Sequence, residues 1–204
     1  MPPRATSRRQ DIAAAALTVL QRDGYAALTA RKIAAEAGLS PGHISYHFAT
    51  MDEVLSEAYR LASRTLRQSE ATLLATTSTP ADRLHAFLAA GFTPDILSPP
   101  HLRMRIDLWS AALSHPAIAE TERTLYDRYR ADLTLHLTAL ASPTSTDKIP
   151  AVTDLIMATL DGLWLDWMRR RDQSAVDNGL RLCLKLAQSE LAAQPQGQAA
   201  KTGP

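Results

Sequence analysis

The chain has 204 residues, of which 46% are hydrophobic and 21% charged, and its formal net charge is +1. This composition indicates an ordinary globular chain with enough apolar side chains for a core, in one larger domain or two small ones. No stretch approaches the roughly 18 apolar residues of a membrane span. The net charge alone does not indicate a nucleic-acid partner, but residues 1–68 carry nine Lys/Arg against six Asp/Glu. The basic excess therefore lies in the first third of the chain.

The single cysteine and the N-terminal sequence both favour a cytoplasmic protein. Cys183 has no intrachain partner and lies among leucines at helical spacing, which is typical of a buried apolar side chain in a reducing compartment. Arg8 and Arg9 precede an apolar run, as in a twin-arginine export signal. Asp11 interrupts that pattern at once and no small-residue cleavage site follows, so we interpret the segment as an amphipathic helix.

Apolar residues recur at helical spacing through nearly the whole chain, which predicts an all-α fold. The first helix should cover about residues 8–23 and end at Gly24. Thr29 can cap a short second helix that ends at Gly38, and Ser40 can cap a third with Pro41 in its first position. Two short helices joined by a tight glycine turn are thus expected before residue 50.

A longer part of the chain follows, and it predicts a second domain. Thr50 to Glu53 form a capping box that begins a fourth helix of about 24 residues, long enough to join two domains. Five more helices are expected near residues 80–92, 100–114, 116–140, 150–170 and 174–193, about nine in all. We predict a helix-turn-helix domain over 1–50, an effector and dimerisation domain over 51–193 with 51–75 as connecting helix, and a disordered tail over 194–204.

The segment GLSPGHISYHF, residues 38–48, admits three interpretations. His43 and His47 share a helix face, as two zinc ligands do, but no third ligand stands nearby, so we expect no metal. A purely structural helix explains Ile44 and Phe48, which face inward. It does not explain an exposed face of short and aromatic residues where Lys and Glu would be usual. DNA binding by the second helix of a helix-turn-helix explains both.

The third interpretation assigns a role to each polar residue in and around the segment. Gly42 lets the helix approach the bases, and His43 and Ser45 offer donors and acceptors to base edges. Phosphate contacts are expected from capped helix starts, from donors late in the third helix and from basic side chains. These predicted phosphate-contacting residues are Thr29, Arg31, Lys32, Ser40, Tyr46, His47 and Thr50, and Arg4, Arg8 and Arg9 are expected at the backbone or minor groove.

The stretch ALTARKIAAEAGLSPGHISYHFATMDEVL resembles the N-terminal helix-turn-helix of the TetR family of bacterial transcriptional regulators. The glycine before ALT, the AxxAGLS turn and the YxF ending fall at family spacing. The resemblance implies an all-α homodimer whose C-terminal domain binds an effector and then releases DNA. It places Gly42, His43 and Ser45 at base-facing positions, and Thr29, Ser40, Tyr46, His47 and Thr50 at phosphate-contacting ones. Met51 stands where many members have a lysine that contacts phosphate.

The C-terminal half suggests a sensor and a dimer interface. The last two helices carry apolar faces, and in the family such helices form a four-helix dimer interface. Tryptophans lie in RMRIDLWSAALSHP and TLDGLWLDWM, which are similar to the choline-responsive, betaine-pathway subgroup of that family. An aromatic and acidic cage for an organic cation would use six residues. They are Met104, Asp107, Trp109, Tyr126, Asp161 and Trp164; that the tryptophans only fill the core and interface stays open.

The function that we predict is an effector-responsive repressor that binds a palindromic DNA operator and is not an enzyme. The sequence does not identify the effector; the two compound classes that we expect are an organic cation and a hydrophobic compound, and no cofactor is expected. One alternative is a helical small-molecule-binding protein or enzyme with a vestigial DNA module, and another is a DNA-binding architectural protein with no effector. The sequence gives little support to an enzymatic activity, because no Ser-His-Asp, Cys-His or phosphate-loop pattern stands at a usable spacing.

Overall fold

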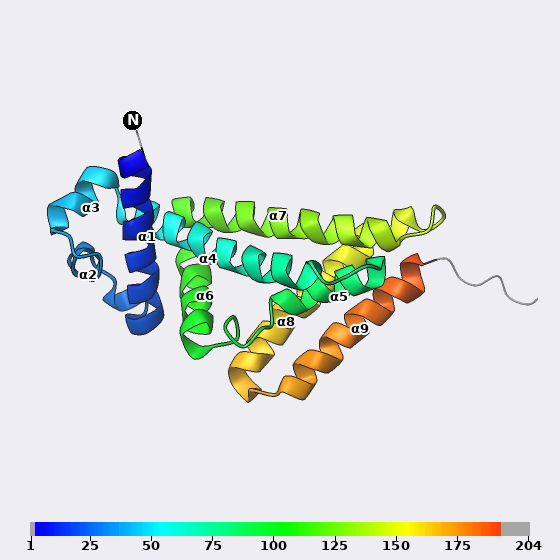
Figure 1. The fold of residues 1–204 in the computed structure, drawn as a ribbon. Coiled ribbons are helices and arrows are strands. Elements are labelled where there is room, and N and C mark those ends of the chain that lie inside the picture. The colour runs from blue at the N-terminus through cyan, green and yellow to red at the C-terminus, as the bar shows by residue number, and fades with distance from the viewer. Residues whose placement is uncertain (1–2, 193–204) are drawn as a thin grey trace, which may run out of the picture. The chain divides into compact units, whose positions relative to one another are not determined.

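The computed structural model describes residues 3–192, and these form nine α-helices, two 3₁₀ turns and no strand. The all-α prediction is confirmed. The elements are α1 (Pro3–Asp23), η1 (Tyr25–Ala27), α2 (Ala30–Glu36), α3 (Pro41–His47), α4 (Met51–Leu74), α5 (Pro80–Ala90), α6 (Pro99–Ala112), α7 (Pro116–Leu140), η2 (Thr146–Lys148), α8 (Ile149–Arg170) and α9 (Gln173–Leu191) (Figure 1). The predicted disordered tail lies outside the described residues. Within them, no helix is both long and apolar enough to cross a membrane.

The helices divide into two compact units. The first comprises residues up to Ala75 together with Ala90–Tyr129, and the second comprises Thr76–Ala89 with the residues from Arg130 onward. Helix α7 contributes its first part to one unit and its last part to the other. The helices α1 to α4 thus share a unit with α6. The domain boundary predicted near residue 50 divides a DNA-binding part from an effector-binding and dimerisation part, and it stays a prediction.

The first unit has a core that holds the three N-terminal helices together. It comprises apolar side chains from α1, α2, α3 and the start of α4, namely Ile12, Ala15, Ala16, Ile33, Ala34, Ile44, Phe48, Val54 and Ala58. Ile44 and Phe48 are each 3% exposed, so α3 is anchored by one face and leaves the other free. The two short helices predicted from sequence, α2 and α3, therefore form a three-helix module with α1 (Figure 1).

A second core in the same unit joins this module to the helices that follow. Its members come from α1, α4, α6 and α7, and they are Leu20, Leu55, Tyr59, Ala62, Met104, Leu108, Ala111 and Ile118. Both α1 and α4 contribute to the two cores. Leu17 and Leu28 pack against both cores, so a shift of α6 against α4 is opposed by side chains that also support the N-terminal module.

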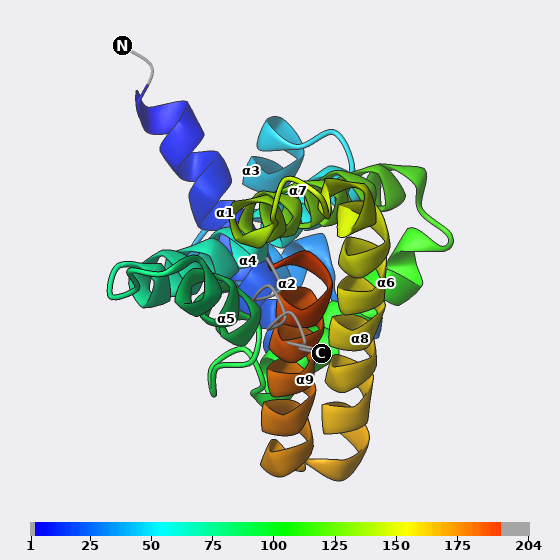
Figure 2. The same cartoon turned by 90° about the vertical axis from the view of Figure 1, so that its right-hand side faces the viewer.

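In the second unit, α8 and α9 lie side by side and antiparallel (Figure 2). The turn between them is short because Arg171 adopts a left-handed conformation, with φ 52°, and Asp172 caps α9 through Ala175 N at 3.2 Å. Cys183 is 4% exposed and faces this packing, which confirms the prediction of a buried thiol. Burial raises the pKa of the Cys183 thiol.

Candidate DNA-binding site

The turn between α2 and α3 has the geometry that its glycine requires. Gly38 has φ +65°, and Leu39 N donates to Ala34 O at 2.8 Å, so the chain reverses within three residues. Glycine adopts such a φ at no steric cost. Asparagine and aspartate tolerate it better than the other residues, for which it is disfavoured. The predicted helix–glycine turn–helix arrangement is therefore present, with α3 as its second helix.

The residues predicted to contact DNA lie at the surface of this module. Nine of the ten are exposed, namely Thr29, Arg31, Lys32, Ser40, Gly42, His43, Ser45, Tyr46 and Thr50, while His47 is half-buried. Tyr46 is 83% exposed, although its ring packs edge-on against His47 with centroids 5.0 Å apart. An aromatic side chain so exposed on a short helix is available to an external partner.

Two of the three predicted helix caps are confirmed. The Thr29 hydroxyl accepts from Lys32 N and the Thr50 hydroxyl from Glu53 N, each at 3.2 Å. The carboxylate of Glu53 accepts from Ala49 N at 3.0 Å, which completes the box one residue earlier than usual. A capping oxygen of Thr keeps its own hydroxyl hydrogen, so both threonines can still donate to a phosphate.

The predicted Ser40 cap is wrong. Ser40 stands at the N-cap position of α3, but its side chain makes no capping bond. Its Oγ instead lies 2.8 Å from His43 Nδ1. A serine hydroxyl can turn toward either partner, and the ring nitrogen three residues on competes with the backbone amide there.

Arg9, one of the predicted DNA-contacting residues, makes a contact within the protein. The Arg9 guanidinium donates to the carbonyl of His47 and lies 4.0 Å from the centroid of the Phe48 ring. The carbonyls at a helix end lack helical partners, and a cation there is stabilised by the helix dipole. Arg9 thus fixes the end of α3. Arg8 is exposed and pairs with Asp11 at 3.7 Å, and the side chain of Arg4 lies outside the described part of the chain.

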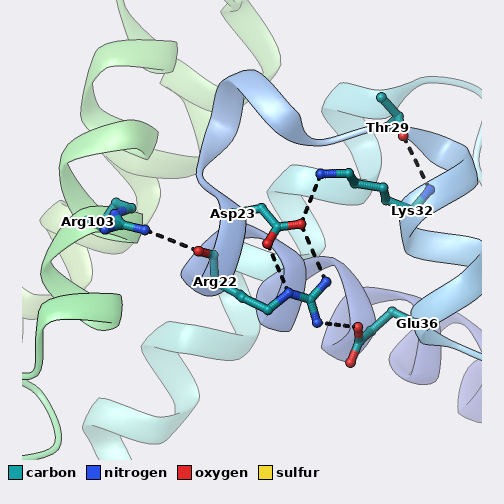
Figure 3. A network of polar contacts seen from close by, with 6 residues as sticks. All are labelled: Arg22, Asp23, Thr29, Lys32, Glu36 and Arg103. Atoms are coloured by element: carbon teal, nitrogen blue, oxygen red, sulfur yellow. Dashed lines mark hydrogen bonds and ion pairs between the residues drawn. The ribbon is translucent and has the colours of Figure 1, made fainter.

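A network of four charges links the end of α1 to α2 (Figure 3). Arg22 donates to Asp23 at 2.9 Å and to Glu36 at 2.8 Å, and Lys32 Nζ donates to Asp23 at 3.0 Å. The hydrogen bonds from Arg22 and then Lys32 lower the pKa of Asp23 to about 2. Two cations balance two carboxylates in this network, so Lys32 adds less positive charge to the DNA-facing surface than the sequence suggested. The exposed Arg31 beside it is therefore the stronger candidate for a phosphate contact.

Helix α6 binds the backbone on both sides of Gly24, an arrangement that we call the Gly24 contact. Arg103 Nη1 donates to the carbonyl of Arg22 at 3.1 Å (Figure 3), and Asp107 Oδ2 accepts from Tyr25 N at 2.8 Å. Gly24 has φ +82° and ψ 170°, and a Cβ built there would lie 3.4 Å from Asp107 Oδ2. These side chains satisfy backbone groups at the break between α1 and η1.

His115, just before α7, adds a second link between the same elements. Its Nε2 lies 2.9 Å from the Tyr25 hydroxyl and its Nδ1 3.2 Å from Asp52 Oδ2 in the first turn of α4. An ionised carboxylate only accepts, so Nδ1 carries a hydrogen; in the neutral ring Nε2 then accepts from Tyr25. Burial, and then the charge of Asp52, raise the pKa of Tyr25, which keeps this hydroxyl protonated.

Neither the Gly24 contact nor the His115 link was predicted. Their members stand 63 to 90 residues apart in sequence. An aspartate or arginine on a helix carries no local signal of a distant backbone partner.

The six predicted effector residues are distributed over both units. Asp107 is committed to Tyr25, and Met104, 1% exposed, packs in the second core of the first unit. In the same unit Tyr126 is 38% exposed, and the Arg105 guanidinium lies 4.9 Å from the Trp109 ring centroid. Asp161 is half-buried and Trp164 is 7% exposed in the second unit. For Asp107 and Met104, the observed contacts are structural ones.

No group of three or more His, Cys, Asp or Glu residues within the described 3–192 is placed to hold a metal ion. On α3, His43 Nδ1 lies 2.8 Å from Ser40 Oγ.

The fold and the exposed face of α3 define a helix-turn-helix DNA-binding protein. Residues 12–58 match the family of bacterial regulatory proteins called the tetR family, and residues 80–192 match the C-terminal domain of BetI-type transcriptional repressors. The second match spans more than half of the chain, which therefore belongs to the TetR family, with a BetI-type C-terminal domain. It is a DNA-binding, effector-regulated transcriptional repressor and not an enzyme, so the enzyme alternative is excluded.

Similar proteins agree with this assignment. The HTH-type transcriptional regulator BetI of Stenotrophomonas maltophilia (strain R551-3) is 28% identical over 159 residues, which cover 78% of this chain and 80% of that protein. A transcriptional regulator from Rhodococcus sp. Rha1 has the same fold, with a TM-score of 0.76 at 22% identity over 92% of this chain and 99% of that one. A transcriptional regulator from Saccharomonospora viridis, solved in complex with choline, has a TM-score of 0.73 at 20% identity over 93% and 100%.

Proposed function

We propose that this repressor acts in the bacterial cytoplasm as a homodimer on a two-fold symmetric operator and leaves it when an organic cation or hydrophobic compound binds. Each protomer places α3 in the major groove. Gly42, His43 and Ser45 face bases, while Tyr46 and His47 contact phosphate. Thr29, Arg31, Lys32, Ser40 and Thr50 contact the backbone on either side.

The observation that carries this proposal is the two-sided character of α3. One side, with Ile44 and Phe48, is buried, and the other presents Gly42, His43 and Tyr46 to solvent without a long mobile side chain. Compact donors and acceptors on a rigid helix suit base edges in a groove about 12 Å wide. Capped helix starts at Thr29 and Thr50 suit the flanking phosphates.

A dimer through α8 and α9 is supported by apolar side chains that these helices leave exposed. Leu155 and Met168 on α8 are 54% and 38% exposed, and Leu182 on α9 is 57% exposed. A two-fold dimer would set two copies of α3 about 34 Å apart, one turn of DNA, which is the spacing of half-sites in a palindrome.

Helix α6 is the proposed route from effector to DNA-binding module. Trp109 Nε1 is buried and has no hydrogen-bond partner among the described residues, so an acceptor atom of an effector that reached it would satisfy that donor. Six residues further toward the N-terminus of the same helix, Arg103 binds the Arg22 carbonyl in the Gly24 contact. Displacement of α6 would strain that contact, and a state that relaxes it by turning α1 would change the half-site spacing.

The choline complex of the S. viridis relative makes choline the first effector to test here. Trp109 and Tyr126 of the first unit remain proposals for its binding, although Arg105 already lies beside the Trp109 ring. Asp161 and Trp164 of the second unit remain a separate proposal. Choline that raises the melting temperature and releases DNA would support them. If choline does neither, it is not the effector, and hydrophobic compounds would be tested next.

Operator binding tests the proposed base and phosphate roles. Purified protein selects an operator from randomised double-stranded DNA, and its affinity is compared with those of Tyr46→Phe and His43→Ala. Tyr46→Phe, which removes only a hydroxyl, should weaken binding to all sequences alike, by about fivefold for one lost hydrogen bond. His43→Ala should instead flatten the preference at one position of each half-site. Unchanged affinity and preference in the double variant His43→Ala/Tyr46→Ala would contradict the proposal.

A further inference from the structure

Ser40 differs from the two other helix-starting residues of the DNA-binding module. Thr29 and Thr50 use their hydroxyls to accept from the backbone amide three residues on. Ser40 occupies the same position before α3, but its hydroxyl lies 2.8 Å from His43 Nδ1 while its carbonyl accepts from His43 N at 3.0 Å. Ser40 therefore contacts both the backbone and the ring of His43.

The hydroxyl contact restricts the His43 ring, while the backbone bond holds the main chain that carries it. An exposed histidine on a helix ordinarily exchanges between rotamers within nanoseconds. With Nδ1 held by Ser40, Nε2 is left as the outer polar atom of the ring, and it is the atom that a base edge would meet. A restricted donor or acceptor loses less conformational freedom on binding than a mobile one.

We propose that Ser40 is a positioning residue for base recognition, because it sets both the orientation of His43 and which ring nitrogen carries the hydrogen. This inference rests on the proposed contacts of α3 with DNA. It adds that the preference at the base read by His43 depends on a serine that touches no base.

The proposed phosphate contact of Ser40 decides the chemistry of that base. A phosphate oxygen only accepts, so a Ser40 hydroxyl that binds phosphate donates its single hydrogen there. The short contact to His43 then requires a hydrogen on Nδ1, which leaves Nε2 of the neutral ring with a lone pair. In the major groove, only adenine N6 and cytosine N4 donate. His43 should therefore recognise an exocyclic amino group.

The experiment uses the full-length protein and the selected operator. His43→Ala first identifies the base position whose preference depends on this residue. Affinities are then measured for four operators that differ only there, with wild type, Ser40→Ala, Ser40→Thr and Thr29→Ala. Thr29→Ala is the matched control, since it removes a capping hydroxyl of the same module without a histidine partner.

Wild type should favour operators with the amino group by about fivefold, the effect of one hydrogen bond. Ser40→Ala should reduce this preference to below about twofold, and Ser40→Thr should restore it, because the hydroxyl returns. Thr29→Ala should weaken binding to all four operators equally. In a His43→Ala background, Ser40→Ala should change the preference no further.

Three results would overturn the inference. They are a full preference in Ser40→Ala, an effect of Ser40→Ala that persists without His43, and a wild-type preference for guanine at this position, which would require a donor at Nε2. Wild-type protein that selects no operator would instead overturn the proposed function.

Discussion

Gly24 offers a direct test of how α6 holds the DNA-binding module. With φ +82° and ψ 170°, it occupies a region that is nearly closed to other residues. Replacement by alanine forces a Cβ into that conformation, and the Cβ would lie 3.4 Å from Asp107 Oδ2, an ordinary contact. The strain is therefore in the backbone rather than in a clash, and relief of it requires the chain between Arg22 and Tyr25 to leave α6.

Gly38 is the matched comparison, because its φ of +65° is also positive but a Cβ there meets nothing within 4 Å. We expect Gly24→Ala to lower the free energy of unfolding by about 2 kcal/mol and Gly38→Ala by about 1 kcal/mol. Asparagine tolerates the left-handed helical region, so Gly38→Asn should recover roughly half of the loss at Gly38. Gly24→Asn should recover none, since ψ 170° lies far from that region.

Thermal unfolding followed by far-ultraviolet circular dichroism measures these differences, at one fixed protein concentration because association would shift the midpoint. For a chain of this length, 1 kcal/mol corresponds to about 2–4 °C. We expect Tm to fall by about 4–8 °C in Gly24→Ala and by about half as much in Gly38→Ala. Equal losses at the two glycines, or recovery by Gly24→Asn, would refute the conformation assigned to Gly24 and the role of the Gly24 contact.

Two further predictions concern DNA approach and assembly. A Cβ at Gly42 would lie 4.0 Å from Ser40 Oγ and meet nothing nearer, so Gly42→Ala should leave Tm unchanged or slightly raised. Operator affinity should fall about tenfold, because the added methyl group would prevent the close approach of α3 to the bases. Unchanged affinity in DNA titrations would contradict that approach. Leu155→Lys combined with Leu182→Lys should convert the dimer to monomers in sedimentation analysis. Leu135→Lys on α7, at a side chain 68% exposed, is the control that should leave the sedimenting mass unchanged. A dimer that survives the double change would show that α8 and α9 do not form its interface.

Much of the fold followed from local sequence. Glycines at helix ends, threonine caps and helical spacing of apolar residues are short-range features, and they predicted nine helices whose later bounds differ from those observed by only a few residues. The first helix begins at Pro3 rather than near residue 8, and a proline in the first turn is compatible with that start. The 3₁₀ turns η1 and η2 escaped prediction, since three residues carry too little pattern.

For the predicted DNA-facing residues, the sequence predicted which side chains are exposed but not which polar partners they have. Exposure of Gly42, His43 and Tyr46 followed from the helical spacing of Ile44 and Phe48, which are buried. The partner of each polar side chain did not follow. A guanidinium such as that of Arg9 can reach phosphate or a carbonyl equally well, and only the position of α3 against α1 decides between them.

The sequence by itself therefore determined the helices, the glycine turn, the buried side of α3 and the family resemblance, because these depend on residues within a few positions of one another. The tertiary structure alone decided that Arg9 fixes the end of α3 and that Asp107 holds Tyr25 rather than facing only an effector. Tertiary packing also brought Asp52, His115 and Tyr25 together. Such contacts join groups tens of residues apart, and their energies depend on distances and angles that exist only once the helices have packed.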